Sequence, residues 1–209
     1  MSLKISGTAP PVRRYLEPRL ETELVCDACK LRYAIYGIFA FCPDCGNHNS
    51  LQMLLTNLEF VRKMLSLAGA ADGELRERLV HDALENAVSA FDGFGREVCR
   101  VGLEKTALTT AWSPSFQNLG AAREAVLRTF GFDLHDGVAD GDWSFLIAAF
   151  QKRHLIAHKM GVIDQKYVNV THDSTAVVGR KVAVASTEVE RTCELLSLLG
   201  ARLSTRLTT

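Results

Sequence analysis

Two Cys-x-x-Cys pairs near the amino terminus constrain the fold of this chain more than any other feature. The first pair is Cys26 and Cys29, the second is Cys42 and Cys45, and twelve residues separate the pairs. Each pair can form a tight turn that directs two sulfur atoms at one ion, so this spacing predicts a four-thiolate zinc site. Such a site leaves no coordination position open, and the predicted zinc is therefore structural rather than catalytic.

Other uses of these cysteines fit the sequence less well. A disulfide framework is typical of secreted proteins, and a redox pair would not need two matched Cys-x-x-Cys pairs. Residues 31–41 are rich in aromatic and β-branched side chains, which predicts a hairpin. We therefore expect residues 21–48 to form a zinc ribbon. The single cysteines Cys99 and Cys193 lie on apolar helical patterns and are predicted to be buried thiols.

The rest of the chain predicts a mostly α fold, with a helical bundle over residues 49–209. Residues 1–20 hold three of the five prolines and little periodicity, so they are expected to form an extended lead-in. Residues 162–184 mix β-branched residues with Gly179, which favours extended chain or a small hairpin, and Thr187 to Glu190 form a capping-box pattern. Apolar residues at helical spacing predict about five helices, over residues 50–67, 74–102, 118–130, 142–159 and 187–207.

Composition excludes some function classes. Lysine plus arginine and aspartate plus glutamate balance at 24 each, so the overall charge does not indicate nucleic-acid binding. No apolar run reaches membrane-spanning length and no targeting signal is evident, so we expect a cytoplasmic protein without a membrane partner. Residues 151–181 are locally basic, with six Lys or Arg against two Asp. This region is either a solvated face or a phosphate-binding cleft.

The predicted helix over residues 142–159 carries an arginine in an unusual place. At about 100° per residue, Arg153 falls in the middle of an apolar arc, with His154 and His158 within the arc or at its edge. A guanidinium is costly to bury without a partner, so part of this face is expected to line a polar cleft or an interface. Histidine titrates near neutral pH and can transfer protons, while arginine matches a phosphate with two hydrogen bonds.

The sequence Arg153-His-Leu-Ile-Ala-His158, followed by Gly-Val-Ile-Asp-Gln-Lys-Tyr-Val at residues 161–168, resembles the signature of the HEPN superfamily. The resemblance implies a small helical bundle and a metal-independent endoribonuclease, in which Arg153 and His158 are catalytic. His154 lies one turn before His158 and about 40° away around the helix, so it either orients His158 or contacts phosphate, or it is a core or capping histidine. The resemblance also implies RNA as substrate, an antitoxin or regulatory protein as a further partner, and a role in antiphage defence or toxin–antitoxin systems. Many members carry Asn after the final His, where this chain has Lys159.

Two acidic residues of the predicted helix over residues 74–102 are further site candidates on the strength of the same resemblance. Some HEPN families place a carboxylate there, near the active site, so Glu85 or Asp92 could tune Arg153; the alternative is that both are solvated carboxylates.

The spacing of the motif bears on oligomeric state. Five residues on a helix place Arg153 and His158 about 140° apart, so one copy cannot easily hold a phosphate between them. Two motif helices that meet across a two-fold axis could combine Arg153 of one copy with His158 of the other, which predicts a homodimer. Two alternatives stay open: zinc binding by the histidine pair, and a non-catalytic dimeric module for interaction or nucleotide sensing.

Overall fold

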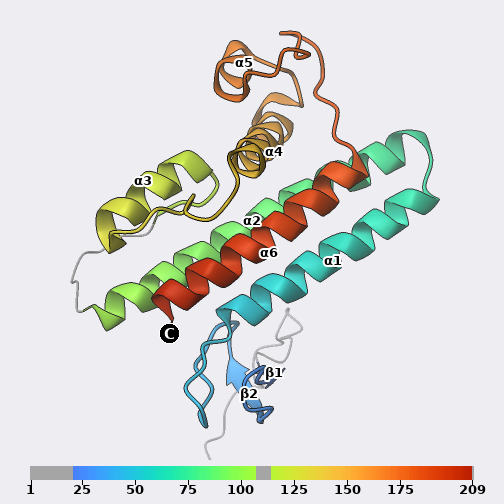
Figure 1. Cartoon of the computed structure of the whole chain (residues 1–209). Helices are drawn as coiled ribbons and strands as arrows, with labels where there is room; N and C mark the ends of the chain where they lie inside the picture. The colour runs from blue at the N-terminus through green and yellow to red at the C-terminus, as the bar shows by residue number, and fades with distance from the viewer. Residues whose placement is uncertain (1–20, 107–113, 209) are drawn as a thin grey trace, which may run out of the picture.

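The computed structural model describes residues 21–106 and 114–208, in which a two-stranded antiparallel hairpin precedes six α-helices (Figure 1). The predicted mostly α fold with a helical bundle after a hairpin is confirmed. The predicted lead-in at residues 1–20 lies outside the described residues. The elements are β1 (Glu21–Val25), β2 (Arg32–Tyr36), α1 (Ser50–Ala70), α2 (Gly73–Lys105), α3 (Leu119–Phe130), α4 (Asp140–Lys159), α5 (Gln165–Thr171) and α6 (Ser186–Leu207).

Three long helices form the centre of the bundle. Figure 1 shows α1, α2 and α6 side by side, with α3 and α4 on the other side of α2 and the hairpin at the amino-terminal end of α1. The C-terminal ends of α2 and α6 meet, where Lys105 Nζ donates to the carbonyl of Thr208 at 2.6 Å. The apolar residues whose helical spacing predicts this helix are all buried along one stripe of α2: Val80, Ala83, Leu84, Ala87, Val88, Phe91, Phe94 and Val98.

Two single cysteines lie in this core. Cys99 on α2 and Cys193 on α6 are fully buried, which confirms the prediction of buried thiols. Burial raises the pKa of Cys99 to about 12 and that of Cys193 to about 11. Both side chains are therefore neutral thiols that pack as small apolar groups.

Helix ends follow the sequence in one case and depart from it in another. The Asn118 side chain accepts the backbone N–H of Ala121 at 3.1 Å and caps α3, as predicted. The predicted capping box at Thr187 and Glu190 is wrong. Helix α6 begins earlier, because the Glu188 carboxylate accepts the backbone N–H of Ala185 at 2.8 Å; alanine has no side-chain acceptor, so only this half of a capping box forms.

The connection between α4 and α6 holds a short helix where extended chain was expected. Asp164 caps α5 by accepting the N–H of Tyr167 at 2.8 Å, and Tyr167 is buried among Leu155, Ile163 and Val182. The extended part of the prediction holds only near the ends of the connection, where residues 162 and 181 form an isolated antiparallel bridge. Burial of Tyr167 thus overrides the β-branched composition of this segment.

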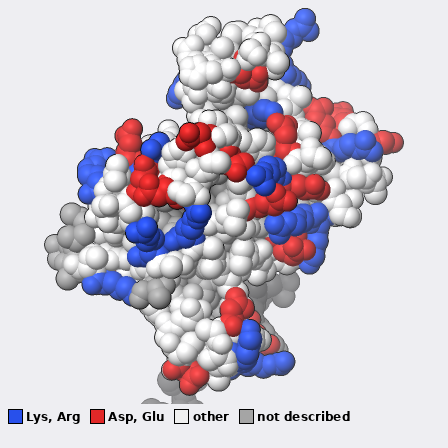
Figure 2. Space-filling model, viewed as in Figure 1, with Lys and Arg blue, Asp and Glu red and all other residues white. Residues whose placement is uncertain are grey.

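Charged side chains cover the outside of the bundle without a single-sign surface in view. Figure 2 shows Lys and Arg interleaved with Asp and Glu over this face, which agrees with the balanced composition of the chain. The visible surface therefore gives no extended basic track for a nucleic-acid backbone.

Two glycines of α2 provide a test of the packing between this helix and residue 116. A Cβ built on Gly95 would lie 2.5 Å from two ring carbons of the buried Phe116, whereas a Cβ on Gly93 meets nothing within 4 Å. We expect Gly95→Ala to lower the free energy of unfolding by about 1–3 kcal/mol because the core is overpacked. Gly93→Ala should raise it by about 0.5–1 kcal/mol through helix propensity. Urea denaturation of both variants checks this, and equal effects would contradict the close approach.

Candidate metal centre and candidate active site

The four cysteines of the two Cys-x-x-Cys pairs come together at one point. Their sulfur atoms all lie within 4.8 Å of one another, with 3.5 Å between Cys26 and Cys45 and 3.6 Å between Cys29 and Cys42. These distances are far longer than the 2.05 Å of a disulfide, and the four cysteines are free. A metal ion bound tetrahedrally at about 2.3 Å separates its sulfur ligands by about 3.8 Å. The cluster therefore fits a four-thiolate metal centre.

The two Cys-x-x-Cys turns have the same backbone pattern. In the first turn the N–H of Cys26 donates to Leu31 and the N–H of Lys30 donates back to Cys26; in the second, Cys42 and Gly46 repeat this pattern with Asn47 as the acceptor. Lys30 and Gly46 both adopt left-handed backbone, at φ 65° and 72°. Each turn thus directs two sulfurs at the same point, as the spacing predicts.

The hairpin that supports the first turn starts earlier in the chain than residues 31–41 suggest. Strand β1 precedes Cys26, and Thr22 pairs with Ile35 across the ribbon. Only the second strand lies in the aromatic and β-branched segment. The first strand, Glu-Thr-Glu-Leu-Val, alternates polar and apolar residues too briefly to be identified with certainty from sequence.

The thiols of the cluster influence one another strongly. The backbone N–H of Cys29 lowers the pKa of Cys26 to about 6. The backbone N–H of Leu31 lowers the pKa of Cys29. Desolvation and the contacts with Cys42 and Cys45 raise it by a larger amount, so that the net pKa is about 12. Four thiolates at this separation repel one another, so a bound cation is what allows all four to stay deprotonated at neutral pH.

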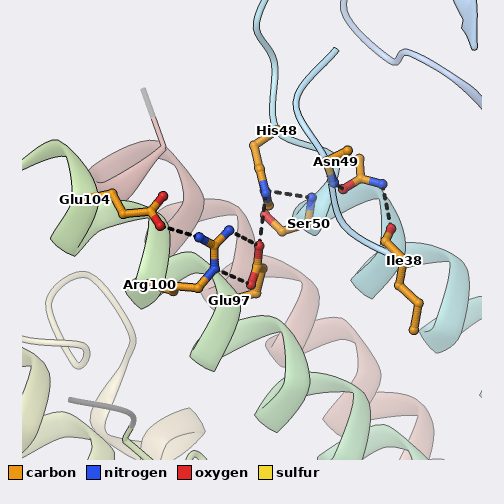
Figure 3. Close-up of polar contacts among 8 residues, drawn as sticks. Ile38, His48, Asn49, Ser50, Glu97, Arg100 and Glu104 are labelled. Carbon is orange, nitrogen blue, oxygen red and sulfur yellow. Dashed lines mark hydrogen bonds and ion pairs between the residues drawn. The ribbon is translucent and has the colours of Figure 1, made fainter. Parts of the chain in front are cut away.

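A buried histidine ties the ribbon to the bundle. His48 Nδ1 accepts the backbone N–H of Ser50 at 3.3 Å, and its Nε2 lies 3.2 Å from a carboxylate oxygen of Glu97 on α2 (Figure 3). Arg100 binds the same carboxylate at 2.7 and 2.9 Å, which lowers the pKa of Glu97. Burial lowers the pKa of His48, so at neutral pH the neutral ring donates to an ionised carboxylate.

The residue that precedes α1 supports the ribbon rather than the helix end. Asn49 lies at the N-cap position, but its side chain makes no cap hydrogen bond. It accepts from the backbone N–H of Ala40 and donates to the carbonyl of Ile38, both at 2.9 Å (Figure 3). These two bonds fix the loop between β2 and the second cysteine pair against the first turn of α1.

Helix α4 carries the three candidate catalytic residues and ends close to the predicted position. It runs to Lys159, and Met160 and Gly161 then adopt left-handed backbone. The N–H of Gly161 donates to the carbonyl of Leu155 at 2.9 Å and closes the helix.

Arg153 lies on the inner side of α4. Its side chain is only 5% exposed, and its Nε is buried without a hydrogen-bond partner. Among the described residues, its guanidinium has no ion-pair partner either. The expectation that part of this face lines a polar cleft or an interface does not hold for Arg153 within a single copy, but Phe145, Ala149 and Ile156 of the same face border pockets with charged walls. A buried positive charge without a counter-ion is energetically unfavourable and favours binding of an anion.

The two histidines of the motif lie nearer the solvent. The ring centroids of His154 and His158 are 4.9 Å apart, and His158 is exposed while His154 is half-buried. Burial lowers the pKa of His154, with further lowering by the charges of His158 and Lys166. The structure therefore brings the histidines together and turns Arg153 away from His158, as the 140° separation predicts.

The segment after the motif has clear structural roles. Gly161 closes α4, Asp164 caps α5, and the buried Tyr167 reaches Asp173 with its hydroxyl at 3.4 Å. Lys152, the residue before Arg153, binds Glu188 at 2.6 Å and the carbonyl of Ala183. The sequence does not indicate the two bonds of Lys152, because Glu188 and Ala183 are distant from it in the chain.

The two acidic candidates of α2 are not alike. Asp92 is buried, in contrast to the expected solvated carboxylate, and it accepts the backbone N–H of Phe116 at 2.5 Å while pairing with Arg96. Its hydrogen bonds hold the start of the segment before α3 rather than Arg153. Glu85 is half-buried and has no hydrogen bond or ion pair to another described residue.

The apolar face of α4 does not need a second copy for its burial. Trp143, Leu146, Ala149 and Phe150 are all buried within one chain as part of the main core. The bundle itself therefore shields these residues from solvent in a monomer. The homodimer stays a prediction that rests on the separation of Arg153 and His158.

Arg153→Met tests whether the buried guanidinium is unpaired in the folded chain. Methionine has a similar length and no charge, so we expect the free energy of unfolding to rise by about 1–3 kcal/mol. Urea denaturation measures this, with Arg78→Met as the control because Arg78 is largely exposed and should change stability by about 0.5 kcal/mol or less. A clear loss of stability in Arg153→Met would show that the guanidinium is held by favourable contacts.

Comparison of this chain with protein-family models, with curated proteins and with solved structures gives no match. None of the helices in the described parts of the chain combines the length and apolar character needed to cross a bilayer.

Proposed function

We propose that this protein is a metal-independent endoribonuclease of the HEPN type that carries a structural zinc ribbon. The observation that supports it is the pairing, on one helix, of a buried arginine that has no counter-ion among the described residues and an exposed histidine in contact with a second histidine. An RNA phosphate is an anion that could satisfy Arg153, and a histidine at neutral pH can accept the 2′-hydroxyl proton.

The proposed reaction divides the chemistry between two residue types. His158 of one copy takes the proton of the ribose 2′-hydroxyl, the 2′-oxygen attacks the phosphorus, and the bond to the 5′-oxygen breaks as His158 of the second copy, in its protonated form, gives that oxygen a proton. The guanidinium of Arg153 stabilises the negative charge that develops on the phosphorane. His154, neutral because its pKa is lowered, orients His158. The product ends are a 2′,3′-cyclic phosphate and a 5′-hydroxyl.

The active form in this proposal is a homodimer. His158 lies on the exposed side of α4 and Arg153 on the buried side, so a phosphate between them is expected to require His158 from one copy and Arg153 from the other. Two apolar residues that follow His158 within four positions are exposed: Met160 is 86% exposed, and Val162 is exposed as well. Exposed apolar residues at this end of α4 favour a contact surface there.

The metal in the cysteine cluster is proposed to be zinc. Four thiolates at tetrahedral spacing suit Zn²⁺, and a closed four-sulfur site supplies no open position for a substrate. Its function is to hold the two turns of the ribbon together.

The test of the main proposal is cleavage of end-labelled single-stranded RNA of mixed sequence with EDTA in excess. We expect fragments that end in cyclic phosphate, and the zinc content of the same sample is measured to show that the ribbon is intact. The absence of cleavage across varied RNAs would remove the enzyme proposal.

A second candidate function is a non-catalytic interaction or nucleotide-sensing module. The observation that favours it is the burial of Arg153 and of the apolar face of α4 inside one chain. In that case the basic end of α4 would bind RNA or a nucleotide without cleaving it. Binding of the labelled RNA that stays intact over hours would support this candidate.

A further inference from the structure

A separate cavity lies between α6 and the connection from α3 to α4. It has a volume of about 300 Å³ and is bounded by residues 132–137 on one side and by one face of α6 on the other. Figure 2 shows a hollow at the left of centre, bordered by Lys and Arg side chains below and beside it and by Asp and Glu side chains above it. This volume is at the lower end of the range for sites that bind small molecules.

The floor of the cavity is apolar. Leu199 and Leu203 of α6 and Leu134 of the connection are each almost completely buried, and Phe132 adds the edge of a half-buried ring. These residues belong to the main core or pack directly against it. The floor is therefore rigid and suits the apolar part of a ligand.

Two arginines stand at the rim, one helical turn apart. Arg202 donates from Nη1 to the carbonyl of Asp136 at 2.9 Å. Its guanidinium lies so close to Gly137 that a Cβ there would be 2.7 Å from Nη1. The Arg206 guanidinium lies 5.5 Å from the centre of the Phe132 ring. Backbone and ring contacts thus orient both guanidinium groups before any ligand binds.

Neither guanidinium forms an ion pair within the described parts of the chain. No carboxylate of a described residue lies within ion-pair distance of Arg202 or Arg206. Each guanidinium has five N–H donors, and the single bond of Arg202 to Asp136 leaves most of its donors free. The rim therefore presents two oriented positive groups with free donors above an apolar floor.

The acidic residues of the wall only partly offset this charge. Asp133 binds Arg123 through two contacts of 2.6 Å, and this pairing lowers the pKa of Asp133. Its charge is neutralised by a residue outside the cavity. Asp136 has no such partner among the described residues and is the one carboxylate of the wall that opposes an anion.

This cavity is distinct from the motif. The residues of the connection that line it come before α4, which begins at Asp140. Arg153 lies about 20 Å from Asp140 along the axis of α4, at 1.5 Å per residue. No residue of the motif lines the cavity. The inference therefore does not depend on the proposed ribonuclease activity.

We propose that this cavity binds a small organic anion with a flat apolar body, whose carboxylate or phosphate group is held by Arg202 and Arg206. The apolar body rests on Leu199 and Leu203 beside the Phe132 ring. The acidic group receives charge-assisted hydrogen bonds from both guanidinium groups, which are the strongest hydrogen bonds available to it.

The test uses two matched fluorescent probes with the full chain. Anilinonaphthalene sulfonate has an aromatic body and an acidic group, and phenylnaphthylamine has the same body without the charge. We expect one saturable sulfonate site, and its affinity should fall about tenfold or more in Arg206→Gln, because one charged donor is lost. Arg202→Gln should act in the same direction, while the neutral probe should change little in either variant.

A charge-matched control and one opposite variant make the test sharper. Arg78→Gln removes a positive charge at the distant end of α2 and should leave sulfonate affinity unchanged. Asp136→Asn removes the opposing carboxylate and should tighten binding. Equal sulfonate affinity in the wild type and Arg206→Gln would overturn the proposal, as would equal losses for both probes.

Displacement of the sulfonate identifies the acidic group. Naphthoate provides the carboxylate arm and adenosine monophosphate the phosphate arm. Competition by either supports the site and shows which group it prefers, and failure of both at millimolar concentration contradicts it. Because the readout is binding rather than cleavage, a negative result here leaves the proposed RNA chemistry untouched.

Discussion

His158→Ala is expected to reduce RNA cleavage by about 10²–10⁴-fold, the usual loss when a general base is removed. The side chain is exposed at the end of α4, where its ring lies against that of His154. Its removal should therefore leave the thermal unfolding temperature within about two degrees of the wild type. Initial rates on labelled RNA with excess EDTA provide the measurement.

The control for this variant is a histidine outside the motif. His172 is exposed and adopts left-handed backbone at φ 51°, so His172→Asn keeps a residue that tolerates this conformation and should retain full activity. Arg153→Lys should lose cleavage as His158→Ala does, because lysine keeps the charge but not the two-pronged geometry. Cleavage that persists in His158→Ala would mean that another residue or a contaminant is responsible for the observed activity.

Loss of the metal is expected to unfold the ribbon and spare the bundle. Purified protein should contain one zinc per chain, and Cys42→Ser should contain well under one. The free energy of metal binding to such four-ligand sites is about 10–16 kcal/mol, and residues 21–48 contribute Leu24 and the cysteines Cys26 and Cys42 as their buried apolar residues. The segment thus has too small a core to stay folded alone.

Elemental analysis and amide hydrogen exchange measure these two effects. In Cys42→Ser the amides of β1 and β2 should exchange rapidly, while those of α2 keep their protection. Cys193→Ala is the matched control, since it removes a buried thiol outside the cluster and should retain zinc. Unchanged protection of the ribbon in metal-free protein would show that contacts such as His48 with Glu97 hold it without the ion.

The parts of the fold that sequence predicted well are those with a repeating or local signal. The stripe from Val80 to Val98 repeats every three to four residues, which fixes both the helix and its buried face. The spacing of Cys26, Cys29, Cys42 and Cys45 predicts that the four sulfur atoms come together, because both turns are local. Asn118 and Gly131 mark the two ends of α3 for the same reason.

The parts that were missed depend on contacts between distant residues. Helix α5 has seven residues and three β-branched side chains near its end, so its stability comes from Asp164 and the burial of Tyr167 rather than from propensity. The pairing of His48 with Glu97 joins residues 49 positions apart. Periodicity identified the apolar face of α4 but not what covers it, which is why the burial of Arg153 in one chain was not foreseen.

The late position of α6 in the chain has a consequence for protein synthesis. Gly200 of α6 packs closely against Leu54 of α1 and near Phe94 of α2, so the core of the bundle stays open until α6 has been made. About a hundred residues lie between the ends of α2 and α6, which at 5–20 residues per second delays completion by roughly 5–20 s. During that interval the nascent α1–α2 pair exposes its apolar face and is a substrate for chaperones, while the cysteine cluster, synthesised first, can already bind its metal.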